Sequence, residues 1–276
     1  MLSLMDAFMK GAALAAGVYS ATWLRSVLAV LLVAPVWLTV RKAWPSRAAL
    51  RLHLGRGVVS AFMALTFFYA LTKLPIAEAI AISFIAPLIA LHLAAILLGE
   101  RVRTEAIVAA LLGMAGTLVI VGGRIGRERM TEDAALGLAA ILFSAVLYAY
   151  NFILIRQQSQ LAGPLEVAVF HGGVSAVILG LAAPWFFALP TLSAFVDLGA
   201  SAVLTVGGAM ALAWAYRRAE AQALVPLEYS GFLWAALFGW LFFAEAVTLT
   251  TVLGTALIVL GCLIAARRKK PLPDAV

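Results

Sequence analysis

Two stretches of the chain, IAEAIAISFIAPLIALHLAAILLGERV (residues 76–102) and AQALVPLEYSGFLWAALFGWLFFAEAV (residues 221–247), follow the same pattern. Each begins with small, helix-forming residues, continues through about twenty apolar residues and then reaches a glutamate preceded by Gly or Ala. The two glutamates, Glu100 and Glu245, are 145 residues apart, and Gly116 and Gly261 have the same separation. This shared offset favours an internal repeat over a chance likeness between two apolar helices.

The composition around these stretches is typical of a membrane protein. Of the 276 residues, 64% are hydrophobic and 12% are charged, and the mean hydropathy is +1.05. A soluble domain carries about 25% charged residues, so these few charges cannot cover a soluble globule. The net charge of +7 does not indicate a nucleic-acid partner, because nucleic-acid binders keep their cations on a hydrated face around an ordinary core. The expected surroundings are a lipid bilayer.

Apolar runs between charged and turn-forming clusters predict ten membrane-spanning helices, because about 20 apolar residues cross the hydrocarbon core. The first span is the shortest, and at 1.5 Å per residue it reaches only about 24 Å. Either the start codon lies too far downstream, which we favour, or this helix begins part-way into the membrane. The predicted spans cover residues 2–17, 20–40, 56–72, 75–98, 104–122, 134–155, 166–188, 197–216, 222–244 and 247–266.

The basic residues predict the orientation of these spans. With the N-terminus in the cytoplasm, fourteen of the twenty Lys and Arg residues, Arg56 among them, lie in the even-numbered loops and the C-terminal tail. Four lie on the opposite side. Positive charge accumulates on the cytoplasmic side of membrane proteins. We therefore expect a multi-pass protein of the plasma (inner) membrane with both termini in the cytoplasm.

A polar connector at residues 123–133 divides the spans into two groups of five, at residues 1–122 and 134–266, and a basic cytoplasmic tail follows at 267–276. Because five is an odd number, the second group is inverted relative to the first. Inverted repeats are typical of secondary transporters. The predicted fold class is therefore an all-α integral membrane protein with ten transmembrane helices arranged as two inverted repeats of five.

Several segments occur in an order and spacing typical of one family: LMDAFMK (4–10), WLRSVLAVLLVAP (23–35), ALTKLPIAEAIAISFIAPLIALHLAAILLGERVR (70–103), AYRRAEAQALVPLEYSGFLWAALFGWLFFAE (215–245) and the Gly-rich last span. Over nearly its whole length the chain resembles EamA-type members of the drug/metabolite transporter superfamily. The resemblance implies a central cavity lined mainly by spans 1, 3, 4, 6, 8 and 9, with spans 5 and 10 at the periphery. A homodimer through these peripheral helices is compatible with that layout.

Ionisable residues inside the spans mark cavities or partners, because burying them in the membrane is costly. Asp6 and Lys10 stand one helical turn apart and either neutralise each other or form a polar stripe that faces the cavity. Glu228 follows Pro226, and for this residue we favour the cavity. For Glu78 we favour a place in the first turn of its helix, where a carboxylate is stabilised. Asp6, Glu78 and Glu228 are also the candidates for proton coupling.

Other candidate cavity residues are polar or aromatic. Asn151 needs a hydrogen-bond partner, either at a helix–helix contact or in the cavity. The aromatic candidates lie on spans that the resemblance assigns to the cavity, where a stacked ring can hold an aromatic or cationic solute. They are Tyr148, Tyr150, Trp214, Tyr229 and Trp234.

Several further polar groups are expected to have structural roles. Arg25 either extends to the lipid headgroups, which we favour, or pairs with an acid. We expect His92 and His171 to have their polar atoms satisfied by packing. Glu100 and Glu245 are expected at helix ends in water.

The function predicted from these features is secondary transport, and not catalysis. The sequence shows no catalytic constellation, no metal-ligand spacing and no Gly-rich phosphate loop, and a single cysteine, Cys262, excludes a cysteine cluster. We therefore expect no enzyme, no cofactor and no metal. The predicted activity is export of a small organic metabolite, amino acid or drug-like solute by alternating access, with the direction resting on the family resemblance. Proton coupling, exchange and facilitated diffusion stay open. The rival classes are a membrane enzyme acting on a lipid-borne substrate and a non-transporting membrane scaffold.

Overall fold

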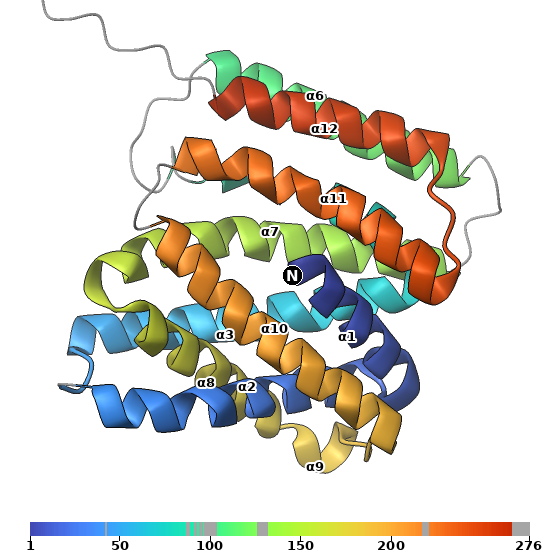
Figure 1. The fold of residues 1–276 in the computed structure, drawn as a ribbon. Helices are drawn as coiled ribbons and strands as arrows, with labels where there is room; N and C mark the ends of the chain where they lie inside the picture. Colours follow the sequence, from blue (N-terminus) through green and yellow to red (C-terminus); the bar gives the residue numbers. More distant parts are fainter. Residues whose placement is uncertain are drawn as a thin grey trace, which may run out of the picture.

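The apolar runs of the sequence form helices in the computed structural model, which describes residues 1–41, 43–86, 89–90, 93, 96, 104–125, 132–216 and 221–266. These residues contain helices and no strand (Figure 1). The helices are α1 (Leu2–Ala16), α2 (Val18–Val40), α3 (Arg47–Lys73), α4 (Ile76–Ser83), α6 (Thr104–Ile125), α7 (Glu132–Leu161), α8 (Pro164–Gly180), α9 (Ala183–Phe186), α10 (Leu192–Tyr216), α11 (Ala221–Phe243) and α12 (Leu249–Ala266).

The lengths and the outer surfaces of these helices suit a membrane. Among the described residues, four helical stretches are long and apolar enough to cross a bilayer: Val18–Val40, Arg47–Lys73, Glu132–Ile155 and Leu192–Ala211. Four shorter apolar stretches accompany them: Leu111–Gly123, Pro164–Gly180, Gly231–Phe243 and Leu249–Gly261. Large apolar side chains such as Leu31, Leu118 and Val177 are more than half exposed, which lipid tolerates and water does not. The all-helical membrane class is confirmed, while the count of ten spans stays a prediction.

Helix α3 begins at Arg47, earlier than the predicted start at residue 56. Ser46 caps it, since the Ser46 hydroxyl oxygen accepts a hydrogen bond from the backbone N–H of Ala49 at 3.2 Å. Arg56 therefore lies well inside the helix and is 9% exposed. Its predicted place in a cytoplasmic loop is wrong, because its guanidinium finds buried amide acceptors on the neighbouring helix α7.

Two other predicted spans are divided or shortened. The span predicted at 75–98 begins as α4 but that helix ends at Ser83. Pro87 stands four residues further on in the sequence, and a proline crowds the carbonyl group four positions before it. The span predicted at 166–188 ends as α8 at Gly180, and the short α9 follows it.

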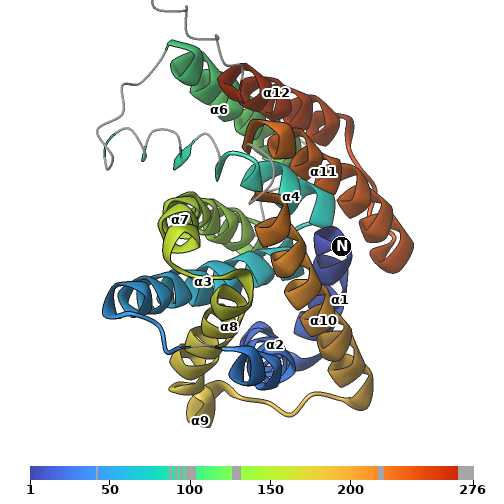
Figure 2. The ribbon, with the colours of Figure 1, turned by 60° about the vertical axis from the view of Figure 1, so that its left-hand side comes forward.

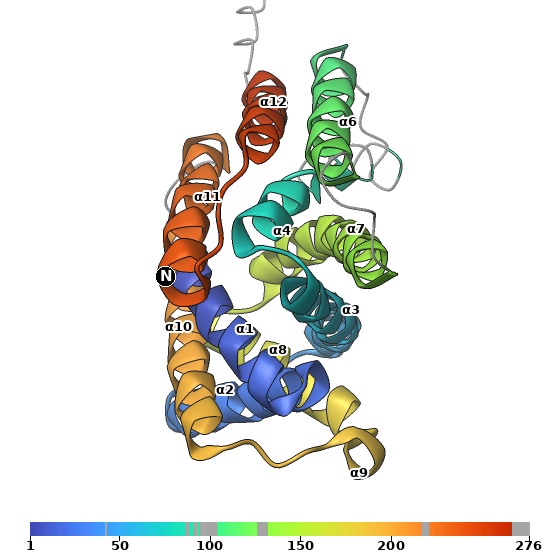
Figure 3. The same ribbon diagram turned by 90° about the vertical axis from the view of Figure 1, so that its right-hand side faces the viewer.

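The helices pack in a recurring set of pairs. Helix α3 packs on α7 and on α8, while α10 packs on α1 and on α2. Helix α4 contacts α7, and α11 contacts α1. Three further contacts join α2 with α8, α4 with α11, and α6 with α12. The α6–α12 pair lies side by side at one end of the molecule (Figure 2), and α1 lies between the α10–α11 side and α3 (Figure 3).

Glycines bring the backbones of α6 and α12 together. A Cβ atom added at Gly116 would lie 2.5 Å from the carbonyl oxygen of Gly254, and a Cβ atom at Gly254 would lie 2.5 Å from the carbonyl oxygen of Gly116. Neither carbonyl can move without disturbing its helix. Small residues that allow such close approach are the usual basis of helix pairing in membranes.

We expect the substitution Gly116→Ala to lower the free energy of unfolding by about 1–3 kcal/mol, because the added methyl group overpacks this contact. Gly122→Ala is the matched control on the same helix, since a Cβ atom there meets nothing within 4 Å. That control is expected to be neutral, or to gain up to about 1 kcal/mol from helix propensity. Thermal unfolding of the purified proteins in detergent checks both. Equal stability of the two variants would contradict the close approach at Gly116.

Candidate functional site

A small pocket lies where α2, α3, α8 and α10 meet. Its walls include small side chains such as Ala29, Ala61 and Ala64, which leave the space open. In this conformation the surrounding helices would have to separate before a whole metabolite could enter. Six polar residues line it: Arg25, Ser26, Ser60, His171, Ser175 and Thr205.

Arg25 is the cationic group of this pocket. It is 8% exposed, its Nη1 donates a hydrogen bond to Thr205 Oγ1 at 3.1 Å, and its guanidinium lies 5.1 Å from the ring centroid of Phe68. The expectation that Arg25 extends to the headgroups is wrong, because α2 begins at Val18 and places Arg25 two turns inside the helix. There it faces neighbouring helices instead of the membrane surface.

Asp6 brings an acidic group towards Arg25 from α1. Its side chain is buried, with 6% exposure, and its charge interacts with that of Arg25. Among the described residues, however, these two groups form no ion pair within 4 Å. The pocket region therefore holds a buried cation and a buried acid that are close but not joined.

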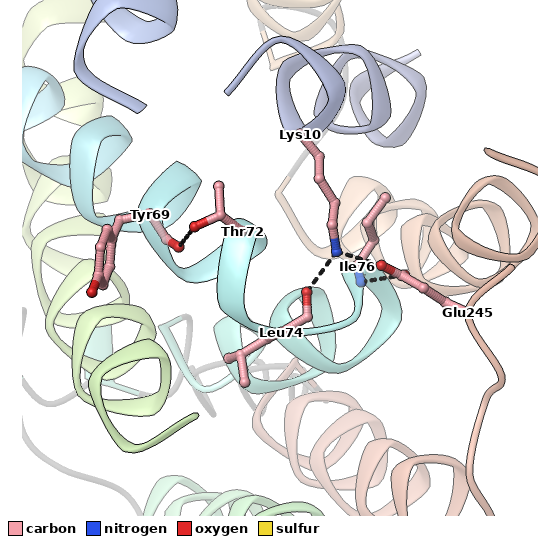
Figure 4. Close-up of polar contacts among 6 residues, drawn as sticks. All are labelled: Lys10, Tyr69, Thr72, Leu74, Ile76 and Glu245. Atoms are coloured by element: carbon pink, nitrogen blue, oxygen red, sulfur yellow. Dashed lines mark hydrogen bonds and ion pairs between the residues drawn. The ribbon is translucent and has the colours of Figure 1, made fainter. Parts of the chain in front are cut away.

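Lys10 reaches across the molecule from α1 to the other half of the chain. Its Nζ donates a hydrogen bond to the carbonyl oxygen of Leu74 at 2.8 Å and forms an ion pair with Glu245 (Figure 4). Glu245 Oε2 also accepts the backbone N–H of Ile76 at 2.8 Å, at the start of α4. Of the two alternatives for Lys10, neutralisation by Asp6 is therefore not the arrangement found, since its partner is Glu245. This Lys10–Glu245 bridge joins α1, the α3–α4 turn and the link between α11 and α12.

The expected solvated position of Glu245 is also wrong, and the local backbone gives the reason. The chain leaves α11 through Ala244, whose φ of 52° lies in the left-handed region. The backbone N–H groups of Ala244 and Glu245 donate back to the carbonyl oxygens of Trp240 and Gly239, each at 3.1 Å. This turn directs the chain at Glu245 back towards α1. A left-handed alanine costs about 1–2 kcal/mol, so the contacts around it must hold it in place.

Asn151 lies at a helix–helix contact between α7 and α3. Its Oδ1 accepts hydrogen bonds from Arg56 Nε at 3.1 Å and from Ser60 Oγ at 3.3 Å. Ser60 also lines the pocket. Asn151 is therefore linked to the pocket through Ser60 and helps to hold the α3 wall of the pocket.

This pocket is not lined by the other candidates whose side chains the structure describes, which are Glu78, Tyr148, Tyr150 and Trp234. Glu78 is buried in the first turn of α4, the position favoured for it. Tyr148 stacks on Phe152 with ring centroids 4.6 Å apart. Trp234 is 51% exposed and stacks on Phe238. The side chains of the remaining candidates lie outside the described residues, as do Glu100 and His92; these candidates are Trp214, Glu228 and Tyr229.

Sequence reasoning missed most of the polar lining, although a signal for it was present. Arg25 and His171 are 146 residues apart, and Ser60 and Thr205 are 145 residues apart. The second separation equals the offset of the predicted repeat, and the first exceeds it by one residue. Ser26, which follows Arg25 directly, is 145 residues from His171. His171 was expected to be satisfied by packing, but its Nδ1 is buried with no hydrogen-bond partner among the described residues. A search for polar residues paired at the repeat offset of 145 would have found Ser26 with His171 and Ser60 with Thr205.

No group of three or more His, Cys, Asp or Glu side chains that could hold a metal ion occurs in the part of the chain that the structure describes. The chemistry available at the pocket is therefore that of hydrogen bonds and charges. Such a site can bind and orient a solute.

Comparison with known proteins places the chain among transporters. It is 29% identical over 272 residues to the pseudopaline exporter CntI of Pseudomonas aeruginosa, a match that covers 97% of this chain and 93% of that protein. It is 33% identical over 101 residues to the aromatic amino acid exporter YddG of Ancylobacter novellus, covering 37% of this chain and 34% of that protein. A solved crystal structure matches with a TM-score of 0.62 and 24% identity, over 96% of this chain and 95% of that chain, which shows a shared fold.

The family model agrees with these relatives. It matches two separate segments, residues 1–122 and 135–267, and carries the description EamA-like transporter family. Because the relatives are transporters, the protein is a transporter and not an enzyme. The chain belongs to the EamA-like transporter family.

Proposed function

We propose that the protein exports a small organic solute by alternating access, with the pocket between α2, α3, α8 and α10 as its central binding site. The observation that carries this proposal is the origin of the polar lining. Ser26 and His171 line the same pocket from equivalent positions of the two halves, 145 residues apart, and so do Ser60 and Thr205. Arg25 stands next to Ser26 in the sequence. Secondary transporters built from inverted repeats bind their substrates at the interface between the repeats.

The packing pattern supports an inverted relation between the halves. If α1, α2, α3, α4 and α6 correspond to α7, α8, α10, α11 and α12, the contact of α3 with α7 has the contact of α10 with α1 as its counterpart. The contacts of α3 with α8 and of α10 with α2 form another such pair. The pairs α2–α8, α4–α11 and α6–α12 each join a helix with its own counterpart. A two-fold relation between the halves accounts for all of these contacts.

The Lys10–Glu245 bridge suits the closed side of such a transporter. It joins the two halves at the α3–α4 turn and at the end of α11. In the orientation predicted from the basic residues, both of these points face away from the cytoplasm. We propose that the bridge closes the outer side and that it opens when the halves rock to release the solute.

The relatives indicate the kind of solute. One is named for export of pseudopaline and another for export of aromatic amino acids, so we propose a small organic metabolite or amino acid.

Asp6, Glu78 and Glu228 remain the proposed groups for proton coupling. Lys10, Tyr148, Asn151, Trp214, Tyr229 and Trp234 remain proposed contributors to the cavity in conformations that open it. We also retain the inner membrane, cytoplasmic termini and a homodimer through the peripheral helices as proposals.

The test is efflux from proteoliposomes that contain the purified protein, with a panel of amino acids, aromatic metabolites and organic acids as solutes. We expect saturable efflux of at least one member of the panel, above the rate of protein-free liposomes. A rate that follows an imposed pH gradient would identify proton coupling, and a rate that ignores it would exclude coupling through Asp6, Glu78 or Glu228. If no member of the panel moves, the proposal fails. If Asp6→Asn and Glu228→Gln both leave the flux unchanged, the assignment of those two acids is wrong.

A further inference from the structure

The pocket between α2, α3, α8 and α10 holds the buried guanidinium of Arg25, which forms no direct ion pair among the described residues. Among the described residues, no carboxylate lies within ion-pair distance of Arg25, and its Nε is buried without a hydrogen-bond partner. Buried polar side-chain atoms are nearly always hydrogen-bonded in folded proteins. Leaving a buried charge unpaired is also strongly destabilising. A ligand that supplies the missing acceptor would remove both costs.

A second unsatisfied group lies in the same pocket. In the part of the chain that the structure describes, the buried side-chain nitrogen and oxygen atoms without a partner are Arg25 Nε and His171 Nδ1. Both residues line the pocket, one from α2 and one from α8, two helices that pack on each other. Because both residues line the same pocket, one ligand group that reaches both atoms can satisfy both.

The hydroxyl groups around this pocket are already engaged. Ser26 Oγ donates to the carbonyl oxygen of Thr22 at 2.9 Å, and Ser175 Oγ donates to the carbonyl oxygen of Gly57 at 3.2 Å. Thr205 Oγ1 donates to the carbonyl oxygen of Ser201 at 2.7 Å. The donors left for a ligand are therefore the guanidinium and the imidazole. This set favours an anion.

The shape and the surrounding charges select the kind of anion. A guanidinium presents its donors in a planar fork that matches a carboxylate. The pocket is small, with alanine walls, and in this conformation it has room for about one water-sized group, so a carboxylate enters only when the surrounding helices separate. The charge of nearby Asp6, which interacts with Arg25, disfavours a doubly charged group such as phosphate. A single carboxylate matches the guanidinium fork and carries one charge.

We propose that this pocket is a carboxylate subsite, in which Arg25 and His171 together hold the carboxylate of the transported solute. The inference rests on the proposed function, since it assigns the substrate class of the same site. The carboxylate accepts hydrogen bonds from Arg25 and from the imidazole of His171 in the tautomer that carries a proton on Nδ1. Because these residues belong to opposite halves, the bound carboxylate links the two halves at the point about which they rock.

Matched pairs of an acid and its amide test this subsite directly. The full-length protein in lipid nanodiscs is titrated with L-leucine and L-leucinamide, with L-phenylalanine and L-phenylalaninamide, and with benzoate and benzamide, and binding is followed by the rise in melting temperature. At least one acid is expected to bind at least tenfold more tightly than its amide. Arg25→Gln and His171→Leu are each expected to weaken the binding of that acid at least tenfold. Arg51→Gln is the matched control, since Arg51 is exposed on α3, and it should bind as the unmodified protein does.

The outcomes separate this inference from the proposed function. If no acid binds, or if each amide binds as tightly as its acid, the carboxylate subsite is wrong even where efflux of some solute is observed. If an acid binds through Arg25 but no solute crosses the membrane, the subsite stands and the transport proposal fails. If Arg25→Gln does not fold, the comparison of acid with amide on the unmodified protein and the His171→Leu variant still decide the question.

Discussion

Replacing Lys10 by Met, or Glu245 by Gln, is expected to lower the free energy of unfolding by about 3 kcal/mol, because each change leaves the other charge buried without its partner. The side chains of Lys10 and Glu245 are only 8% and 14% exposed. After Lys10→Met, the Glu245 carboxylate would keep only the backbone N–H of Ile76. After Glu245→Gln, Lys10 would lose its ion pair with the Glu245 carboxylate and keep the carbonyl oxygen of Leu74.

A double-mutant cycle measures the coupling in this bridge. Thermal unfolding in detergent of the two single variants and of Lys10→Met/Glu245→Gln should show that the double variant loses less stability than the two single losses combined. The ion pair of Lys73 with Asp133, at 2.7 Å, provides the control, because its side chains are 26% and 68% exposed. The cycle of Lys73→Met and Asp133→Asn should give a coupling of about 0–1 kcal/mol. Equal coupling in the two cycles would mean that the Lys10–Glu245 bridge has no special role in joining the halves.

The same variants bear on transport. If the bridge closes one side, losing about 3 kcal/mol from the closed state would shift the balance between the two access states by about two orders of magnitude. Efflux from proteoliposomes should then fall in Lys10→Met and in Glu245→Gln, while Lys73→Met keeps the rate of the unmodified protein. Unchanged efflux in both bridge variants would contradict the proposed closure.

The class of the fold followed from the sequence because it depends on composition and on the length of apolar runs. A prediction that depended on the position of one residue within its own helix was also correct, since Glu78 lies in the first turn of α4. Predictions that depended on whether a side chain points towards neighbouring helices or towards the membrane surface were wrong. Arg25 was expected at the headgroups and Arg56 in a loop, yet both are buried. A single span does not show which neighbours cover a polar residue, since that depends on helices far away in the sequence.

Glu245 shows a second limit of the same kind. Its contact with Lys10 joins residues 235 positions apart and depends on the left-handed backbone at Ala244. Alanine gives no sign of that conformation in a sequence. The repeat offset, in contrast, does carry information across the chain, because it pairs Ser26 with His171 and Ser60 with Thr205, and all four residues line the pocket. Polar residues that correspond between repeats are therefore better guides to the pocket than polar residues taken singly.

Replacing Gln158 by Leu is expected to lower the free energy of unfolding by about 3 kcal/mol. Gln158 is 2% exposed, and its Oε1 accepts a hydrogen bond from Arg56 Nη1 at 2.6 Å. It also forms a hydrogen bond with His53 Nδ1, and His53 Nε2 in turn lies 2.9 Å from Glu166 Oε1. Leucine would leave the buried guanidinium with fewer acceptors and His53 without one of its partners, and hydrogen bonds to charged groups are the costly ones to lose. The hydrogen-bond network that joins α3, α7 and α8 would then lose the residue that links Arg56 with His53.

The neighbouring residue supplies the control for this prediction. Gln157 is exposed on the same helix, so Gln157→Leu makes the same chemical change without touching the network, and its stability should stay within about 0.5 kcal/mol of the unmodified protein. Thermal unfolding in detergent compares the two variants. Gln158→Asn is the conservative third variant: a shorter amide cannot keep both contacts, so its loss should lie between those of the other two. If Gln158→Leu were as stable as Gln157→Leu, Arg56 would have to be satisfied by other groups, and the α3–α7–α8 network would not hold the wall of the pocket.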